Sequence, residues 1–184
     1  MIRELEFQAL SQRHCDEIYR YALGLLGSPA DAEDATQEAL LRLWNHLPRL
    51  NLFNIRAWLY RTTRNYCLDQ IRRRSRVVSS NAEVDETIED WPDEVAVDPS
   101  CAADSSFQLE QARKALLKLP EALRSVFVLY EVNGLRYREI ASTLGMPVNS
   151  VKVNLLRARQ KLSKLIQKEE YGSRTAEADS RTSA

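Results

Sequence analysis

Seven arginines gather on one stretch of this chain, together with aromatic residues. Residues 54–76 hold these arginines against a single acid, Asp69, and Trp58, Tyr60 and Tyr66 lie between them. Guanidinium groups hold phosphates and aromatic faces stack on unpaired bases, which is the chemistry of single-stranded or melting DNA. The alternative is a solvated arginine face with a core tryptophan, and for Trp58 alone we expect the core. For the arginine cluster the composition favours nucleic acid.

A second basic segment, residues 137–168, has the pattern of a helix-turn-helix. Its longer helix carries an apolar stripe at helical spacing, formed by Val151, Leu155, Ala158, Leu162 and Leu165. The remaining side chains of its early turns are the candidate DNA contacts, namely Asn149, Ser150, Lys152, Val153, Asn154 and Arg157. Arginine and lysine can take guanine or phosphate, asparagine adenine, and valine a thymine methyl group. The alternative is a plain amphipathic helix, but an exposed apolar pair, Val153 and Leu156, has little use on a solvated face.

The predicted helix over residues 29–46 begins with a cluster of acids. Asp34, Gln37, Glu38 and Leu41 share one face, at spacings i, i+3, i+4 and i+7. Acids in a first turn also compensate the positive end of the helix dipole, which is the purely structural explanation. The functional explanation is a protein partner that offers complementary basic residues.

The cysteines and histidines do not indicate an enzyme. Cys15, Cys67 and Cys101 are widely spaced, and His14 and His46 are too few and too scattered for a metal site. We expect Cys67, which lies on an apolar stripe, to be a small core residue. A nuclease would need acids beside a phosphate site, whereas the acids here lie apart from the arginines. We predict a non-enzymatic protein with no catalytic residue, metal or cofactor.

The hydropathy of the chain indicates no membrane segment. No apolar run reaches the ~18 residues of a membrane span, and no signal peptide is visible. We therefore expect a cytoplasmic protein without direct membrane insertion.

The elements that must position these residues are helices. Glycine and proline are scarce, the long segments show helical periodicity, and no alternating run indicates a strand, so the predicted class is all-α. The expected helices cover residues 3–26, 29–46, 55–74, 107–119, 120–132, 137–144 and 148–168. Gly27 ends the first, and Ser28 caps the second, with Pro29 in its first turn and Asp31 facing its positive end. The expected buried face of the second helix is Ala32, Ala35, Ala39, Leu43 and Leu47, and Pro48 to Asn54 is expected to be a loop.

Charge is strongly segregated although the net charge is zero. Residues 1–76 hold 12 bases and 9 acids, residues 77–106 hold 9 acids and no base, and residues 107–184 hold 14 bases and 8 acids. Two basic blocks around an acidic middle suggest that the ends meet nucleic acid. We predict two small helical domains, a three-helix domain over 1–76 and a helix-turn-helix domain over 107–170. A flexible acidic linker (77–106) joins them, and a disordered tail (171–184) follows.

Three segments in order resemble the σ70-type sigma factors of the extracytoplasmic-function (ECF) group. DAEDATQEALLRLW, from Asp31, is similar to the family's region 2.2, and WLYRTTRNYCLDQIRRR, from Trp58, to regions 2.3–2.4. The stretch from Leu119 to Leu162, LPEALRSVFVLYEVNGLRYREIASTLGMPVNSVKVNLLRARQKL, is similar to region 4. The likeness covers about residues 10–76 and 110–168.

This resemblance implies a promoter-specificity subunit of RNA polymerase. Core polymerase would be bound through its β′ clamp by Asp34, Gln37, Glu38 and Leu41, and through its β flap. The −10 element of promoter DNA would be captured and melted by the loop 48–54 and by Asn54, Arg61, Arg64, Asn65, Arg72 and Arg73. The −35 element would be read by Asn149, Ser150, Lys152, Val153, Asn154 and Arg157. The acidic linker resembles the segment that threads toward the active centre and RNA exit path of polymerase. Such factors are typically held by an anti-sigma partner.

The chain departs from the family pattern in places that bear on promoter choice. Its recognition helix begins Asn149-Ser-Val-Lys-Val-Asn154, where the family usually has Gly-Thr-Val-Lys-Ser-Arg, so we expect a changed −35 preference. Arg136 stands where the family often places a capping Ser or Thr, at an expected cost of about 1 kcal/mol. The −10 loop, Leu50-Asn-Leu-Phe-Asn54, lacks the charged and glycine residues common there.

The rival to a sigma factor is a stand-alone helix-turn-helix regulator that binds duplex operator DNA without polymerase. It leaves the block over residues 28–76 unexplained. A third possibility, prompted by the altered recognition helix, is a defective or regulatory sigma-like factor.

Overall fold

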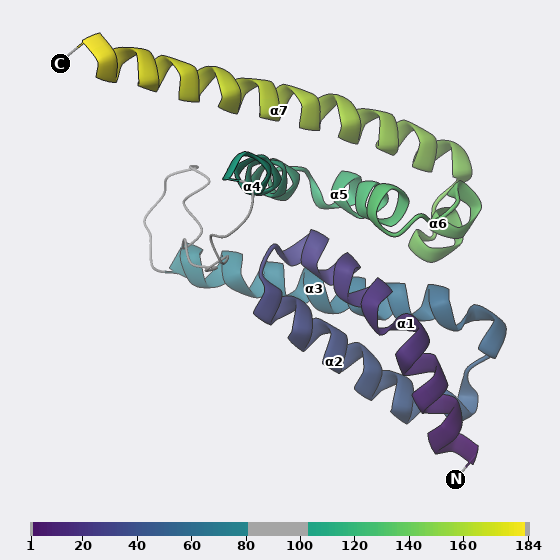
Figure 1. Ribbon diagram of the computed structural model, residues 1–184. Coiled ribbons are helices and arrows are strands. Elements are labelled where there is room, and N and C mark those ends of the chain that lie inside the picture. Colours follow the sequence, from purple (N-terminus) through teal and green to yellow (C-terminus); the bar gives the residue numbers. More distant parts are fainter. Residues whose placement is uncertain (1, 81–102, 183–184) are drawn as a thin grey trace.

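The computed structural model describes residues 2–80 and 103–182 and places side chains for residues 2–76 and 110–167. Every regular element in these ranges is helical, which confirms the predicted all-α class. The order is α1 (Ile2–Leu26), α2 (Pro29–His46), η1 (Leu47–Arg49), η2 (Leu52–Asn54), α3 (Ile55–Ser80), α4 (Ala103–Leu117), α5 (Glu121–Phe127), the π-helical turn η3 (Val128–Val132), α6 (Tyr137–Leu144) and α7 (Val148–Thr182). In Figure 1, α4, α5 and α6 lie between α7 on one side and α1 to α3 on the other.

The N-terminal half, α1 to α3, forms as its sequence predicts. Gly27 takes a positive φ of 74° after α1, a conformation that glycine adopts without strain. Ser28 then caps α2 by accepting the backbone N–H of Asp31 at 3.4 Å, and Pro29 occupies the first turn. The predicted inner face of α2 is buried throughout, and Cys67 is a fully buried core residue of α3.

The C-terminal half, α4 to α7, builds the helix-turn-helix from α6 and α7. Gly145 closes α6 with a left-handed backbone (φ 67°), which makes the tight turn that the sequence predicts. Val151, Leu155 and Ala158 of α7 are fully buried, whereas Leu162 and Leu165 further along are half-buried. The apolar stripe therefore holds the recognition helix by its first three turns.

Several elements run beyond the bounds that the sequence predicts. The loop over 48–54 is largely two 3-10 turns, since the Asn51 side chain accepts the backbone N–H of Phe53 at 3.0 Å and starts the second turn. Helix α3 continues to Ser80 and α4 begins at Ala103, each inside the segment predicted as linker, of which residues 81–102 lie outside the described part. Helix α7 continues to Thr182, through part of the segment from Tyr171 that is predicted as a disordered tail.

The two halves pack against each other, which the sequence did not predict. Helix α1 contacts α4, α5 and η3, and α3 contacts α6. One continuous cluster of buried apolar residues runs through both halves. The buried hydroxyl of Tyr21 on α1 donates to Ser125 on α5 at 3.2 Å.

Glu17 on α1 is the centre of a polar network in this junction. Its carboxylate accepts hydrogen bonds from Arg56 at 2.7 Å and Tyr60 at 2.9 Å and pairs with His14 at 2.6 Å. Its backbone carbonyl accepts from Asn133 of the C-terminal half at 2.7 Å. Burial raises the pKa of the Glu17 carboxyl, but the hydrogen bonds from His14, Arg56 and Tyr60 outweigh burial and bring the pKa down to about 2.

We expect Glu17 to stabilise the fold at neutral pH and to lose that effect in acid. Its folded pKa lies below the unfolded value of 4.5, so its contribution is present above pH 4.5 and is lost as the pH falls toward 2. Glu17→Gln should lower the free energy of unfolding at pH 7 by about 1 kcal/mol or more. Denaturant unfolding between pH 7 and pH 2 should show the two proteins converging in acid. A constant difference across that range would contradict this role.

Candidate nucleic-acid interface

The candidate −10 residues of α3 form a stripe that faces solvent. Arg61, Asn65 and Arg72 are exposed and follow one another at helical spacing, and Asn54 is exposed just before the helix begins. The pair of Arg72 with Asp69, at 3.7 Å, is a solvent-exposed contact of little strength. Arg73 is exposed as well. A row of guanidinium and amide groups on one helix face can track a phosphate backbone.

Arg64 differs from the other candidate −10 residues because a carboxylate of the C-terminal half binds its guanidinium group. Its Nε and Nη2 donate to the two carboxylate oxygens of Glu121 at 2.8 and 2.9 Å. The side chains of this pair are only 25% and 28% exposed. A bidentate pair of this kind fixes Arg64 away from any ligand.

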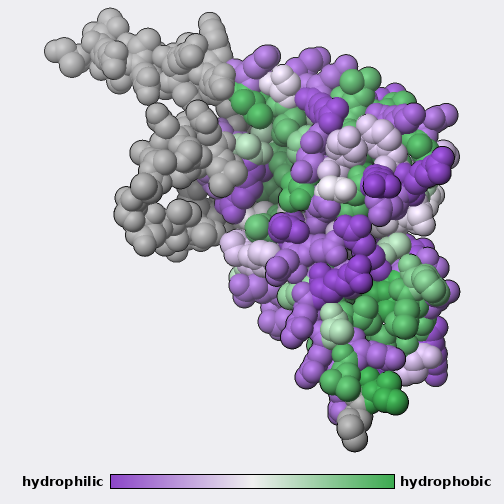
Figure 2. All heavy atoms as spheres, turned by 45° about the vertical axis from the view of Figure 1, so that its right-hand side comes forward, coloured by the Kyte–Doolittle hydropathy of each residue, from purple (hydrophilic) through white to green (hydrophobic). Residues whose placement is uncertain are grey.

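The turn before α3 carries an apolar feature that sequence reasoning missed. Phe53 is 97% exposed and Leu52 is 56% exposed, both in η2. Figure 2 shows an apolar area among hydrophilic side chains at the end of the molecule where α1 begins. The signal was present in the sequence, since two large apolar residues stand between two asparagines in a segment predicted as a loop. An exposed phenyl ring beside an arginine stripe can stack on an unpaired base.

The recognition helix α7 presents most of its predicted contacts. Asn149, Lys152, Val153 and Arg157 are exposed. The Lys152 ammonium lies 5.9 Å from the centre of the Tyr137 ring. Ser150 is half-buried, and the Asn154 amide nitrogen turns toward the Met146 sulfur at 3.9 Å. These two side chains are therefore less available for contacts with DNA than the other four.

The start of α6 is capped despite the departure at Arg136. The Glu139 carboxylate accepts the backbone N–H of Arg136 at 2.7 Å, which retains half of a capping box. Beside it lies a hollow of about 700 Å³, which is lined by Arg136, Tyr137, Arg138, Glu139, Val148 and Lys152. Three of these six side chains are basic, which suits a phosphate backbone running along the helix-turn-helix.

The acidic face of α2 is accessible. Asp34 and Gln37 are exposed, and Leu41 is 59% exposed although it is a large apolar residue. Glu38 is partly exposed and holds Arg42, one turn on, at 2.7 Å. An exposed leucine flanked by acids is typical of a surface that meets an apolar and basic partner.

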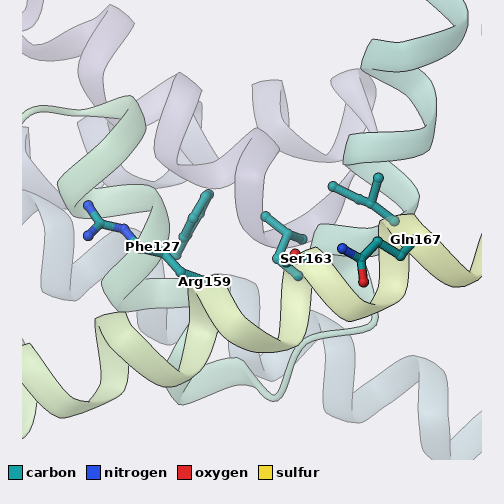
Figure 3. Close-up of a pocket in the computed structure, with 6 residues that line it drawn as sticks. Phe127, Arg159, Ser163 and Gln167 are labelled. Carbon is teal, nitrogen blue, oxygen red and sulfur yellow. The ribbon is translucent and has the colours of Figure 1, made fainter.

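A further groove lies between α5 and α7. Its volume is about 480 Å³, and its lining is Phe127, Arg159, Leu162, Ser163, Ile166 and Gln167. In Figure 3 the side chains of Arg159, Ser163 and Gln167 come from α7, and Phe127 comes from α5 beside it. Arg159 also donates to Glu131 at 2.5 and 2.8 Å, so its guanidinium is occupied.

Within residues 2–80 and 103–182, no three His, Cys, Asp or Glu side chains lie together as a metal would require. Burial raises the pKa of the Cys67 thiol to about 12, so it is not a nucleophile at neutral pH. In the same part of the chain, no helix is long and apolar enough to cross a membrane.

Family models match both halves of the chain. Sigma-70 region 2 matches residues 10–77, and Sigma-70, region 4 matches residues 109–162. The first match covers α1 to α3 with the arginine stripe, and the second covers the helix-turn-helix.

Proteins with similar sequences are sigma factors as well. The ECF RNA polymerase sigma factor SigE of Mycolicibacterium smegmatis is 34% identical over 92% of this chain, which spans 64% of the length of that relative. SigW of Bacillus subtilis, also an ECF RNA polymerase sigma factor, is 31% identical over 81% of this chain and 82% of its own length.

Solved structures of sigma factors share the fold. The sigma factor RpoE in complex with the anti-sigma factor NepR, from Bartonella quintana, superposes with a TM-score of 0.71 at 26% identity over 88% of this chain and 97% of its own. CnrH in complex with the cytosolic domain of CnrY gives a TM-score of 0.65 at 25% identity over 90% of each chain. With both regions present and in order, the chain belongs to the ECF sigma factors, the non-enzymatic subunits that direct transcription initiation by RNA polymerase.

Proposed function

We propose that this chain docks on core polymerase through the acidic face of α2, reads the −35 element as duplex through α7, and captures and melts the −10 element through η2 and α3. The observation that carries the proposal is the chemistry of three separate accessible faces. One is acidic with an exposed leucine, and two are basic with apolar residues among the bases. A stand-alone operator-binding protein would use only one of the three faces.

The −35 assignment rests on the side chains that α7 presents. Lys152 and Arg157 can take phosphate or guanine, and Val153 can meet a thymine methyl group. Asn154, turned toward Met146, would have to rotate to reach a base. The −35 preference of this chain therefore depends on Val153 and Arg157 more than the family pattern implies.

The −10 assignment rests on the combination of Phe53 with the stripe Arg61, Asn65 and Arg72. Arginines hold the phosphates of one strand while an exposed aromatic ring stacks on a base that leaves the duplex. No metal or nucleophile is needed for such melting, because binding to the single strand supplies the free energy.

Two protein contacts complete the proposal. The groove between α5 and α7, with Phe127, Leu162 and Ile166 in its lining, suits an apolar element of polymerase such as the β flap. An anti-sigma factor is the second expected partner, since the similar RpoE chain was solved with one. The chain would work in the cytoplasm, where polymerase and promoters meet.

Genome-wide run-off transcription with bacterial core polymerase tests the function as a whole. We expect new, defined start sites that share two upstream motifs. Binding to core without any start site would favour a regulatory sigma-like role. Operator binding by the chain alone, with no affinity for core, would favour the stand-alone regulator.

Glu38→Lys should weaken binding to core polymerase by about tenfold or more, which is 1.4 kcal/mol. The change reverses the charge in the middle of the α2 face, and losing the surface pair with Arg42 should cost the fold little. Fluorescence anisotropy of labelled chain against core measures the affinity. Asp16→Lys, the same charge change at an exposed site of α1, is the control. Equal affinities for all three proteins would refute the docking assignment.

Arg157→Ala should reduce promoter selection while core affinity stays intact, with a loss of about 1–3 kcal/mol at the contacted base. Run-off yields from a promoter and from point variants of its −35 element give the measurement. Lys161→Ala is the matched control, because that exposed base lies one turn further along α7 and outside both the expected DNA contacts and the groove. A drop in core affinity or thermal stability for Arg157→Ala would show that this residue is not a DNA reader.

Phe53→Ala should impair promoter melting without destabilising the protein, because the ring is almost fully exposed. Stacking on one base contributes about 1–3 kcal/mol, so open complexes should fall by about fivefold or more. Permanganate footprinting of unpaired thymines measures melting, and Phe53→Tyr, which keeps the ring, should retain it. Normal melting by the alanine variant would remove the loop from the mechanism.

A further inference from the structure

A pair of stacked tyrosines beside the helix-turn-helix carries an inference that rests on the proposed function. We propose that Tyr137, stacked on Tyr130, positions the ammonium group of Lys152 and thereby lets this lysine discriminate among −35 sequences. Lys152 is one of the expected −35 contacts, whereas neither tyrosine is. Tyr137 is therefore a positioning residue, because its ring acts on DNA through the lysine and not through a contact of its own.

The two tyrosine rings form a fixed platform. Tyr130 lies in η3 and Tyr137 is the first residue of α6, and their ring centres are 5.1 Å apart with 11° between the ring planes. Both side chains are half-buried and pack on the hydrophobic core. At this separation, stacked rings attract each other beyond the effect of the area that they bury. The pair therefore offers a ring surface whose place is set by the core.

Two cations of α7 lie against this pair. The Lys152 ammonium is 5.9 Å from the centre of the Tyr137 ring, and the Arg159 guanidinium is 5.5 Å from the centre of the Tyr130 ring. The two cations are seven residues apart in the sequence, so they share one face of α7 at a spacing of two turns. The face of an aromatic ring attracts cations within about 6 Å. The tyrosine pair thus meets the recognition helix at both of these turns.

The two cations differ in what else they contact. Arg159 donates from Nε and Nη2 to one carboxylate oxygen of Glu131, at 2.8 and 2.5 Å, so a carboxylate pairs with its charge. Lys152 is exposed, and within residues 2–76 and 110–167 no carboxylate forms an ion pair with it. An aromatic ring orients a cation without cancelling its charge. The Lys152 ammonium is therefore directed by Tyr137 and remains available to DNA.

The orientation of a lysine decides what it contributes to DNA binding. A lysine stem is flexible, and a free ammonium serves any phosphate within reach, which binds all sequences alike. A stem that already rests against a ring has less rotamer freedom to lose, and its ammonium approaches one part of the groove. In that place it can select a guanine. The ring of Tyr137 thus favours a base contact over a phosphate contact.

The hollow beside α6 holds other bases that can serve the phosphates. Arg136 and Arg138 line the same hollow of about 700 Å³ as Tyr137 and Lys152, and both arginines are exposed. Guanidinium groups are strong donors to phosphate oxygens. General affinity for DNA therefore depends little on how Lys152 is oriented, whereas the choice of sequence depends on it.

Substitutions of Tyr137 separate this role from simple packing between η3 and α6. Tyr137→Leu keeps apolar bulk but removes the ring, and Tyr137→Phe keeps the ring. Each full chain, assembled with core polymerase, is assayed on a promoter found by run-off transcription and on single base-pair variants of its −35 element. We expect Tyr137→Leu to lower the preference at one position about threefold, with general affinity and its salt dependence unchanged. Tyr137→Phe should retain the preference.

A double substitution shows whether the ring acts through the lysine. Lys152→Ala should reduce the preference at the same position, and Tyr137→Leu should then have no further effect in that background. Losses that simply add in the double variant would overturn the positioning role. So would a Tyr137→Leu chain that unfolds at a lower temperature but keeps its full preference, because the pair would then serve packing alone.

The contact between ring and lysine can also be measured without polymerase. Lysines of the full chain that are dimethylated with carbon-13 keep their charge, and the ring current of Tyr137 should move the NMR signal of Lys152 upfield. Loss of the signal in Lys152→Arg assigns it. The signal should return to the ordinary lysine position in Tyr137→Leu and stay shifted in Tyr137→Phe. An ordinary position in the wild-type chain would overturn the inference, whereas failure of the wild-type chain to initiate with core would overturn the proposed function.

Discussion

The arrangement of this chain depends on one constraint, the need to hold the guanidinium groups that face the junction of its halves. Across that junction, Arg56 and Arg64 meet the carboxylates of Glu139 and Glu121, and Arg113 and Arg124 meet carbonyls at the end of α1. The pair of Arg64 with Glu121 is shielded from solvent on most of its surface, so it contributes more to the packing of the halves than the exposed pair of Arg56 with Glu139.

Three carboxylates, those of Glu17, Glu121 and Glu139, hold arginines of α3. Glu17 differs from the other two, because its carboxylate joins α1 to α3 within the N-terminal half. Glu121 and Glu139 instead join α3 to the C-terminal half.

Local patterns in the sequence predicted the helices and most of the exposed faces. The cap Ser28, the turn at Gly145 and the stripe of α2 depend on neighbours a few residues apart, and such spacing is visible in a sequence. The partners of Arg64 could not be predicted, since Glu121 lies 57 residues away and no periodicity links them. The role of Phe53 was not predicted, because a loop has no periodicity that would separate an exposed apolar side chain from a buried one.

The most direct test of this account is a crosslink from the turn before α3 to promoter DNA. A photoreactive phenylalanine analogue in place of Phe53, whose ring is 97% exposed, would report it in the complex with core polymerase and promoter. The account predicts crosslinks to unpaired bases of the −10 element. Crosslinks to protein alone, in a complex that initiates transcription, would contradict it.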